Sequence, residues 1–269
     1  MANYSEWLAV AESLAEEASR AVLGFVNSSF ETRHKSDNSP VTEADLASDR
    51  ILRAGLAREF PDHAVLTEEN GLTGRADSEY VWLIDPLDGT KAFAKGIPGF
   101  CVMVGLLKAG RPVLGVVVDP LEGRRYSAVR GEGATQRQGG LTEKLHVSSR
   151  SEPSAMPLVV STGFPEKPLE ELRTYIPGPL LDPINSVGIK VGLLVRQLAD
   201  VYVNHHPVSY WDTCAPLVIL EEAGGSFTSL DGQPLDYTLR PPYGHGVKTL
   251  ASNGLRHREW VEALKHVPV

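Results

Sequence analysis

The segment Asp85-Pro86-Leu87-Asp88-Gly89-Thr90 places two carboxylates three residues apart, directly after the apolar run 80–84. Proline fixes one backbone dihedral and glycine permits a tight turn, so both carboxylates can converge at the end of a strand. Two neighbouring anions repel each other and need a proton or a cation, and hard cations such as Mg²⁺ prefer oxygen ligands. If a helix begins at Gly89, its amides add an anion site beside the metal, the arrangement that phosphoryl transfer requires. Taken alone, the segment is also typical of a turn in which an aspartate caps a helix.

Three further acidic segments lie at the ends of expected elements. Residues 42–45 open a helix and contain Asp45, residues 67–70 follow a short apolar run and contain Glu68 and Glu69, and Asp212 opens a helix after an apolar strand. Each segment alone is typical of a helix cap or a solvated loop. Together with Asp85 and Asp88, they predict a site for several Mg²⁺ ions, assembled from distant parts of the chain.

The apolar periodicity indicates which elements position these segments. Helical spacing predicts helices over residues 7–25 and 42–60, and short apolar runs predict buried strands from residue 80 to residue 129. The second half alternates predicted strands at 158–161, 201–203 and 249–251 with helices at 187–198, 213–223 and 258–266. This mixture predicts a layered α/β or α+β architecture. The polar stretch 131–157 is the expected boundary between an N-terminal metal-binding half (1–150) and a C-terminal half (151–269).

Composition narrows the class of protein. The 269 residues are 42% hydrophobic and 22% charged, which is ordinary for a globular protein, and the net charge of −8 argues against a nucleic-acid polymer as partner. Two cysteines, Cys101 and Cys214, exclude a disulfide framework. The N-terminus has no signal-peptide pattern, and no apolar run approaches ~20 residues. We therefore expect a soluble, cytoplasmic protein without a transmembrane segment.

These ordered motifs resemble the inositol monophosphatase and 3'(2'),5'-bisphosphate nucleotidase superfamily of lithium-sensitive, Mg²⁺-dependent phosphatases. The resemblance covers residues 5 to 265 and rests on the signatures 82–90 and 211–225, with 39–45 and Glu68-Glu69 in the expected order. It implies an α-β-α-β-α sandwich of the sugar phosphatase type, a small phosphorylated substrate and a possible homodimer. The alternative is a catalytically silent protein that uses the acidic residues to hold a structural Ca²⁺.

The resemblance also assigns metal ligands. Glu68, Asp85 and the carbonyl of Leu87 would hold the first Mg²⁺, and Asp85, Asp88 and Asp212 would hold the second. Glu68 would also reach a third ion through water, so two to three ions are expected. The resemblance does not assign Glu69 as a metal ligand and places it only next to the residues that hold the ions.

Catalytic roles follow from the same resemblance. Thr90 would orient the attacking water, Asp45 would accept from the Thr90 hydroxyl, and Glu68 would act through its metal. The amides of Gly89 and Thr90 would bind phosphate oxygens.

The substrate is less sharply specified. Lys91 and Lys190 match lysines of the nucleotidase branch, and a second cation suits a substrate with two phosphates, which favours hydrolysis of the 3'(2')-phosphate of 3'-phosphoadenosine 5'-phosphate. The alternative interpretation of Lys190 is a solvated residue on a helix, without contact to substrate. Ser186 lies in a segment closer to the inositol branch, and His205 replaces the glutamate that this branch usually has there. We expect Lys190, Ser186 and His205 at the substrate, with an inositol-1-monophosphatase or a broad sugar-alcohol or histidinol phosphate phosphatase as the alternative.

Overall fold

The computed structural model describes residues 3–26, 32–34, 40–75 and 77–268. Its larger sheet has eight strands in the order β10-β9-β8-β7-β6-β5-β3-β4, and β3 and β5 are parallel whereas the other neighbours are antiparallel. The strands are β3 (Ala64–Thr67), β4 (Gly71–Thr73), β5 (Tyr80–Asp88), β6 (Cys101–Lys108), β7 (Arg111–Asp119), β8 (Arg124–Val129), β9 (Gly133–Gln138) and β10 (Leu141–Leu145).

The smaller sheet belongs to the second half of the chain. Its order is β11-β12-β14-β13, with β11 parallel to β12. Its strands are β11 (Leu158–Val160), β12 (Val201–Asn204), β13 (Ser226–Ser229) and β14 (Thr249–Ser252). The short strands β1 (Thr32–His34) and β2 (Pro40–Thr42) form a separate antiparallel pair.

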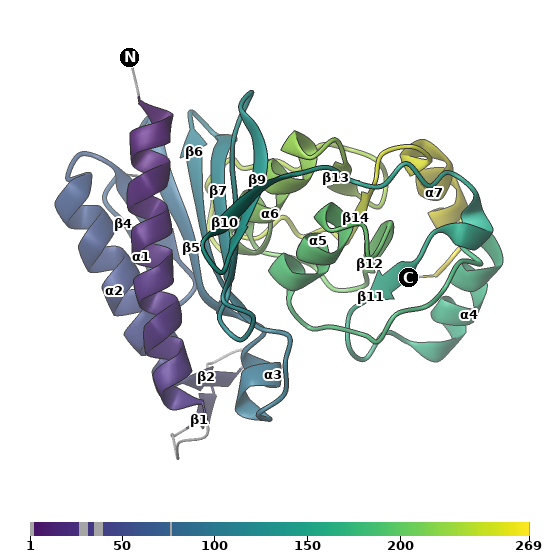
Figure 1. Ribbon diagram of the computed structural model, residues 1–269, viewed down its shortest axis with the longest axis horizontal. Coiled ribbons are helices and arrows are strands. Elements are labelled where there is room, and N and C mark those ends of the chain that lie inside the picture. Colours follow the sequence, from purple (N-terminus) through teal and green to yellow (C-terminus); the bar gives the residue numbers. More distant parts are fainter. Residues whose placement is uncertain (1–2, 27–31, 35–39, 76, 269) are drawn as a thin grey trace.

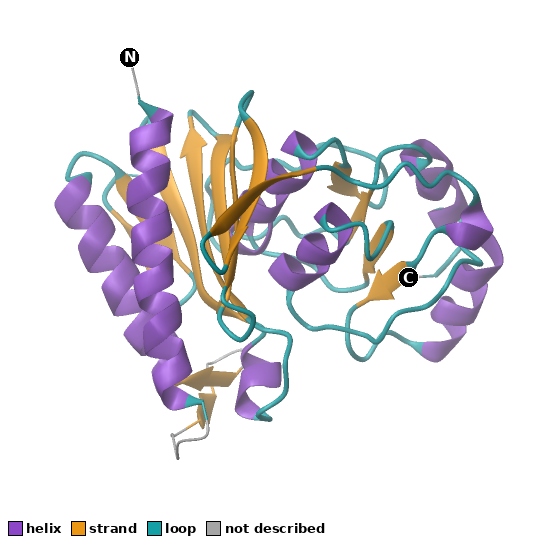
Figure 2. Cartoon of the chain, in the orientation of Figure 1, coloured by secondary structure: helices purple, strands orange, loops and turns teal. Residues whose placement is uncertain are grey.

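Helices alternate with the two sheets in five layers (Figures 1 and 2). The pair α1 and α2 covers one face of the large sheet, α5 and α6 fill the space between the sheets, and α4 and α7 cover the outer face of the small sheet. The expected α-β-α-β-α sandwich is therefore confirmed. The helices are α1 (Tyr4–Phe25), α2 (Glu43–Glu59), α3 (Thr90–Ala94), α4 (Glu166–Tyr175), α5 (Val187–Val195), α6 (Tyr210–Glu222) and α7 (His257–Leu264), with a 3₁₀ turn at Pro153–Ala155.

Strand β6 shows why its segment reads as a continuous apolar run. Cys101, Met103 and Leu107 point to the layer of α5 and α6, whereas Val102 and Val104 point to α1 and α2. Successive strand residues face opposite sides, so a strand covered on both faces is apolar at every position.

Helix α6 lies directly on the large sheet because two facing strand positions are glycines. A Cβ atom at Gly105 or Gly115 would come within 3.0 Å of Cys214 or Ala215 of α6. This close approach fixes the position of α6, the helix that carries Asp212.

The stretch 131–157, which the sequence predicts as the boundary between the halves, contains regular structure. Its first part forms the β9–β10 hairpin, which extends the large sheet through backbone pairing with β8. Helix α4, which is absent from the elements that the sequence predicts, lies within the Pro-rich residues 165–183. Residues 34–40, a polar stretch whose composition is typical of a loop, lie mostly outside the described residues. The division near residue 150 stays a prediction. Within the described ranges, no helix combines the length and the hydrophobicity needed to cross a bilayer.

Candidate active site

A cavity of about 230 Å³ lies where the carboxyl end of β5 meets the N-terminal ends of α3 and α6. It brings together residues that are more than 120 positions apart in the sequence, because Asp212 and Asn185 come from the second half of the chain. The residues that line it are Pro40, Glu68, Asp85, Leu87, Asp88, Gly89, Thr90, Lys91, Asn185 and Asp212. All five expected metal ligands therefore border one cavity.

The parallel pairing of β3 and β5 explains how two of the acidic segments meet. Thr67 pairs with Ile84, so both strands end at the same edge of the sheet. The Glu68 amide donates to the Ile84 carbonyl at 3.3 Å, which holds the 67–70 turn beside Asp85. Side chains that follow neighbouring parallel strands converge at that edge.

A bulge at the end of β5 directs Asp85 and Asp88 to the same side. Pairing with β6 shifts register between these two residues, which adds a residue to β5 and turns its backbone. The Leu87 amide donates to Asp85 Oδ1 at 3.0 Å, and Ser48 of α2 donates its hydroxyl to the Pro86 carbonyl at 2.7 Å. The turn is thus stabilised by a hydrogen bond between two of its own residues and by a hydrogen bond from α2.

Gly89 is required for the step from β5 into α3. Its φ is +95°, a left-handed conformation that favours glycine, and a Cβ atom there would collide with the Gly99 carbonyl. It is the N-cap residue of α3, which begins at Thr90. Gly89 and Thr90 both line the cavity, so the first turn of α3 borders the carboxylates.

Asp45 and Thr90 form a hydrogen-bonded pair. The Thr90 hydroxyl lies 2.9 Å from Asp45 Oδ1 and 3.0 Å from the Leu87 carbonyl. Asp45 Oδ2 accepts from the amide of Thr42 at 2.8 Å and from its hydroxyl, which forms a capping box at the start of α2. The helix cap and the contact with Thr90 therefore use different oxygens of one carboxylate.

Asp88 is fixed by the N-terminal end of α5. Its Oδ2 accepts from the Ser186 hydroxyl at 2.6 Å and from the Gly188 amide at 2.8 Å. Ser186 is fully buried and also caps α5 by accepting from the Ile189 amide. The structure thus places Ser186 behind Asp88, outside the residues that line the cavity, and a contact between Ser186 and substrate stays a prediction.

Asp212 occupies the first turn of α6. The helix begins at Tyr210, three residues earlier than the sequence indicated, and its N-cap is Ser209. The reading of Asp212 as the N-cap residue is therefore wrong. Asp212 instead closes a capping box, because its Oδ2 accepts from the Ser209 amide at 2.6 Å.

The carboxylates raise one another's pKa. Burial, followed by repulsion from Glu68, Asp88 and Asp212, raises the pKa of Asp85 well above its usual range. Burial also raises the pKa of Asp88, although the hydrogen bond from Ser186 opposes this, and burial with the Asp88 charge raises the pKa of Asp212 to about 8. Carboxylates in this arrangement take up protons or cations.

Lys190 lies in the protein interior. Its side chain is fully buried, and its ammonium donates to Ser161 Oγ at 2.9 Å and to the carbonyls of Ile184 at 2.7 Å and Asn185 at 3.0 Å. An ammonium has three protons, so all of them are used. The reading of Lys190 as a solvated helix residue is wrong, and a direct contact with substrate stays a prediction that requires one of these bonds to break.

His205 is also buried and does not line this cavity. Its ring packs edge-on against Phe164 at 4.8 Å between centroids and lies 3.7 Å from the ring of His206. Burial and the His206 charge lower the pKa of His205 to about 4, so the ring is neutral at pH 7. Its contact with substrate remains a prediction.

Several residues that shape the site had no clear sequence signal. Asn185 lines the cavity, and only its place just before the Ser186 cap could have indicated it. Asp49 is buried on α2 and accepts at Oδ2 from Asn70 Nδ2 at 2.6 Å and from Arg53 Nε at 2.7 Å. This carboxylate therefore ties the turn that carries Glu68 to α2.

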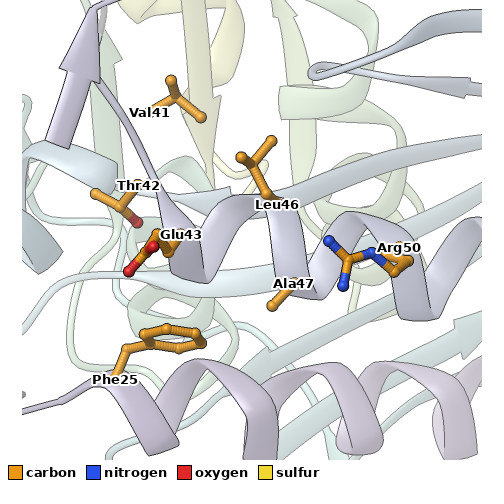
Figure 3. A pocket seen from close by; sticks show the side chains of 7 residues that line it. All are labelled: Phe25, Val41, Thr42, Glu43, Leu46, Ala47 and Arg50. Atoms are coloured by element: carbon orange, nitrogen blue, oxygen red, sulfur yellow. The ribbon is translucent and has the colours of Figure 1, made fainter. Parts of the chain in front are cut away.

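A second cavity of about 310 Å³ lies on the outer side of α2 (Figure 3). It is lined by Phe25 at the end of α1, by Val41 and Thr42 of β2, and by Glu43, Leu46, Ala47 and Arg50 along α2. It contains none of the expected metal ligands. The acidic cavity is therefore the candidate active site.

Comparison with known proteins gives consistent matches. The inositol monophosphatase family matches residues 3–263. A 3'(2'),5'-bisphosphate nucleotidase CysQ of Aggregatibacter actinomycetemcomitans is 33% identical over 233 residues, covering 86% of this chain and 87% of that protein. A histidinol-phosphatase of Streptomyces coelicolor is 32% identical, covering 96% and 97%. The solved inositol monophosphatase of Anabaena is 31% identical with a TM-score of 0.79, covering 99% and 98%.

Proposed function

Because this chain belongs to the inositol monophosphatase family and is a phosphoric monoester hydrolase, we propose that it removes the 3'-phosphate of 3'-phosphoadenosine 5'-phosphate. The observation that carries the proposal is the position of Lys91, an exposed cation that lines the same cavity as the acidic residues and the first turn of α3. A second phosphate next to the scissile one needs a cation at the rim. The similarity to a bisphosphate nucleotidase supports the same substrate.

The donor set fits Mg²⁺. Four carboxylates and the Leu87 carbonyl, all hard oxygen donors, border the cavity. The raised pKa values of Asp85, Asp88 and Asp212 come first from burial and then from neighbouring negative charge, which a cation would neutralise. Among the described residues, no three His, Cys, Asp or Glu side chains already surround one point as ligands. We propose that Glu68, Asp85 and Asp88, with Asp212 and the Leu87 carbonyl, hold two to three ions. Magnesium supplies positive charge that offsets the phosphate and makes water a better nucleophile.

The Asp45–Thr90 pair is proposed to position the attacking water. A hydroxyl has one proton, and the Asp45 carboxylate is a stronger acceptor than the Leu87 carbonyl, so the proton points to Asp45. The Thr90 oxygen is then left as an acceptor for a proton of the water. The amides of Gly89 and Thr90, which border the cavity, are proposed to bind the phosphate oxygens.

Replacing Lys91 by alanine tests the substrate. We expect the Lys91→Ala variant to raise KM for 3'-phosphoadenosine 5'-phosphate about tenfold, the effect of one lost charge-assisted hydrogen bond, and to leave KM for inositol 1-phosphate unchanged. Steady-state phosphate release measures both. The control is Lys95→Ala, since Lys95 is exposed at the other end of α3 and does not line the cavity.

The same assay distinguishes the alternatives. Higher kcat/KM for inositol 1-phosphate or histidinol phosphate than for the bisphosphate would overturn the nucleotidase proposal and favour the corresponding monophosphatase. Lithium inhibition, a cytoplasmic location and a homodimer belong to the same proposal, and each has its own assay: inhibition kinetics, fractionation and light scattering.

Metal binding and pH are expected to be linked. In the folded state, the pKa values of Asp85, Asp88 and Asp212 lie above the unfolded value of about 3.9. Deprotonation therefore destabilises the metal-free protein progressively as pH rises from about 4 through about 8. At low pH, protons compete with Mg²⁺ for the carboxylates, whereas at high pH the carboxylates are deprotonated and bind Mg²⁺ more tightly. We expect saturating Mg²⁺ to raise Tm by about 5–10 °C at pH 8.5 and by much less at pH 5.5.

Differential scanning calorimetry at matched ionic strength measures this link between metal and pH. Sodium chloride replaces the magnesium salt in the control. Equal Tm shifts at the two pH values would contradict a site built from these carboxylates.

A further inference from the structure

A third cavity, of about 260 Å³, lies on the α1 side of the large sheet. It shares no lining residue with the acidic cavity. Its walls come from α1, the β7–β8 turn, β8 and the β9–β10 turn. Its charged lining residues are Glu16, Arg20, Arg124, Arg125 and Arg137. Four arginines and one glutamate thus border a single cavity in a chain whose net charge is −8.

The sheet register places two of these arginines directly opposite each other. Arg125 of β8 pairs with Arg137 of β9, so their side chains leave the same face of the sheet. Like charges in directly opposed positions destabilise a sheet unless a counter-charge lies between them. Arg125 meets Glu12 at 2.9 Å and also pairs with Glu16, both on α1.

The remaining arginine groups have spare donors. Arg20 and Arg137 are exposed, and neither side chain has an ion pair or hydrogen bond within the described part of the chain. Arg125 is about nine-tenths buried, yet its Nε atom has no partner among the described residues. Arg124 donates from Nε and Nη2 to Gln138 Oε1, at 3.3 and 3.1 Å, and its Nη2 atom also lies 3.5 Å from Glu122 Oε2. The cavity therefore offers unpaired guanidinium donors from α1, through Arg20, and from β9, through Arg137.

We propose that this cavity binds a phosphate group. Guanidinium groups present paired donors that match phosphate oxygens. A doubly charged anion would offset the charges of Arg20 and Arg137, neither of which has a carboxylate partner among the described residues. Both carboxylates near Arg125 are already engaged with it, so they oppose the anion weakly. The group comes either from free inorganic phosphate, which the enzyme itself releases, or from a small phosphorylated metabolite. The site is independent of which substrate the acidic cavity hydrolyses.

Calorimetric titration of the full-length protein with inorganic phosphate tests this site. With Mg²⁺ present, both cavities can take up phosphate, whereas in EDTA the acidic carboxylates repel it, and only the arginine cavity remains. We expect binding in EDTA to be weakened about tenfold by Arg20→Gln or by Arg137→Gln, the effect of one lost charge-assisted contact. Both side chains are exposed, and glutamine keeps part of the aliphatic chain, so each change mainly removes the charge.

Arg111→Gln is the matched control, because Arg111 is an exposed arginine of the same sheet that lines a different cavity. The proposal predicts no change in phosphate affinity for this variant. Absence of binding in EDTA, an equal loss in the Arg111 variant, or equal heat from chloride at matched ionic strength would each overturn the proposal. A failed substrate assignment would leave these titrations unaffected.

The same titration with glycerol 3-phosphate in EDTA identifies the source of the phosphate. Binding at least tenfold tighter than that of inorganic phosphate assigns the site to a phosphorylated metabolite. Equal or weaker binding assigns it to free phosphate. Each result supports a phosphate site, provided that the Arg20 and Arg137 variants lose it.

Discussion

Asp88→Asn is expected to lower kcat by about 10³-fold or more at saturating Mg²⁺. Losing a carboxylate ligand removes several kcal/mol of charge stabilisation, and each 1.4 kcal/mol is tenfold in rate. The fold should persist, because the asparagine carbonyl can still accept from the Ser186 hydroxyl and the Gly188 amide. Its amide group would then face the cavity, where a cation is expected.

The measurements are phosphate release and thermal unfolding. Burial already raises the pKa of Asp88, so a neutral side chain should leave the metal-free Tm unchanged or higher. Asp119→Asn is the control, since burial raises the pKa of Asp119 as well but this residue lies at the end of β7, away from the cavity. An Asp88→Asn enzyme with full activity would refute the assignment of this ligand.

Asp45→Asn is expected to lower kcat by about 10² to 10⁴-fold, the range for a lost acid–base group. The asparagine carbonyl must take the position of Oδ2, which accepts from the Thr42 amide. Its NH₂ group then faces Thr90 and donates to the hydroxyl. Thr90 would have to direct its proton elsewhere, so the polarity of the pair reverses while the capping box of α2 survives.

Variants of Thr90 separate this reversal from a structural effect. Thr90→Val should lose as much activity as Asp45→Asn, and Thr90→Ser, which keeps the hydroxyl, should retain most of it. The double variant Asp45→Asn, Thr90→Val should be no slower than either single variant, because the two residues act as a unit. Additive losses in kcat would show that the residues act separately.

The local motifs of the site could be predicted because the residues lie in short segments with distinctive geometry. The strand before Asp85, the turn at Gly89 and the capped helix at Asp45 each depend on neighbours within a few positions. Their convergence in one site was inferred from the number of acidic segments and from the resemblance, but the geometry of that convergence was not predicted. It depends on the parallel pairing of β3 with β5 and on the close contact of α6 with Gly105 and Gly115. The spacing of residues in the sequence specifies neither.

The misjudged elements have identifiable physical causes. The β9–β10 hairpin lies at the sheet edge, where β10 is mostly exposed, so no apolar alternation marks it. Helix α4 contains Pro168, but a proline in the first turn costs no internal hydrogen bond. The buried state of Lys190 depends on acceptors from residues 161, 184 and 185, a contact set that no local pattern reveals.

Gly105 and Gly115, which lie against α6, are expected to be under selection although they are not part of the cavity. A methyl group at Gly105 or Gly115 would push against Cys214 or Ala215, and the displacement would pass along a rigid helix to Asp212, one turn or less away. Neither glycine lines the cavity. Evolutionary drift at these two positions should therefore be as restricted as drift at a ligand, and loss-of-function alleles should arise there in proteins whose catalytic residues are all intact.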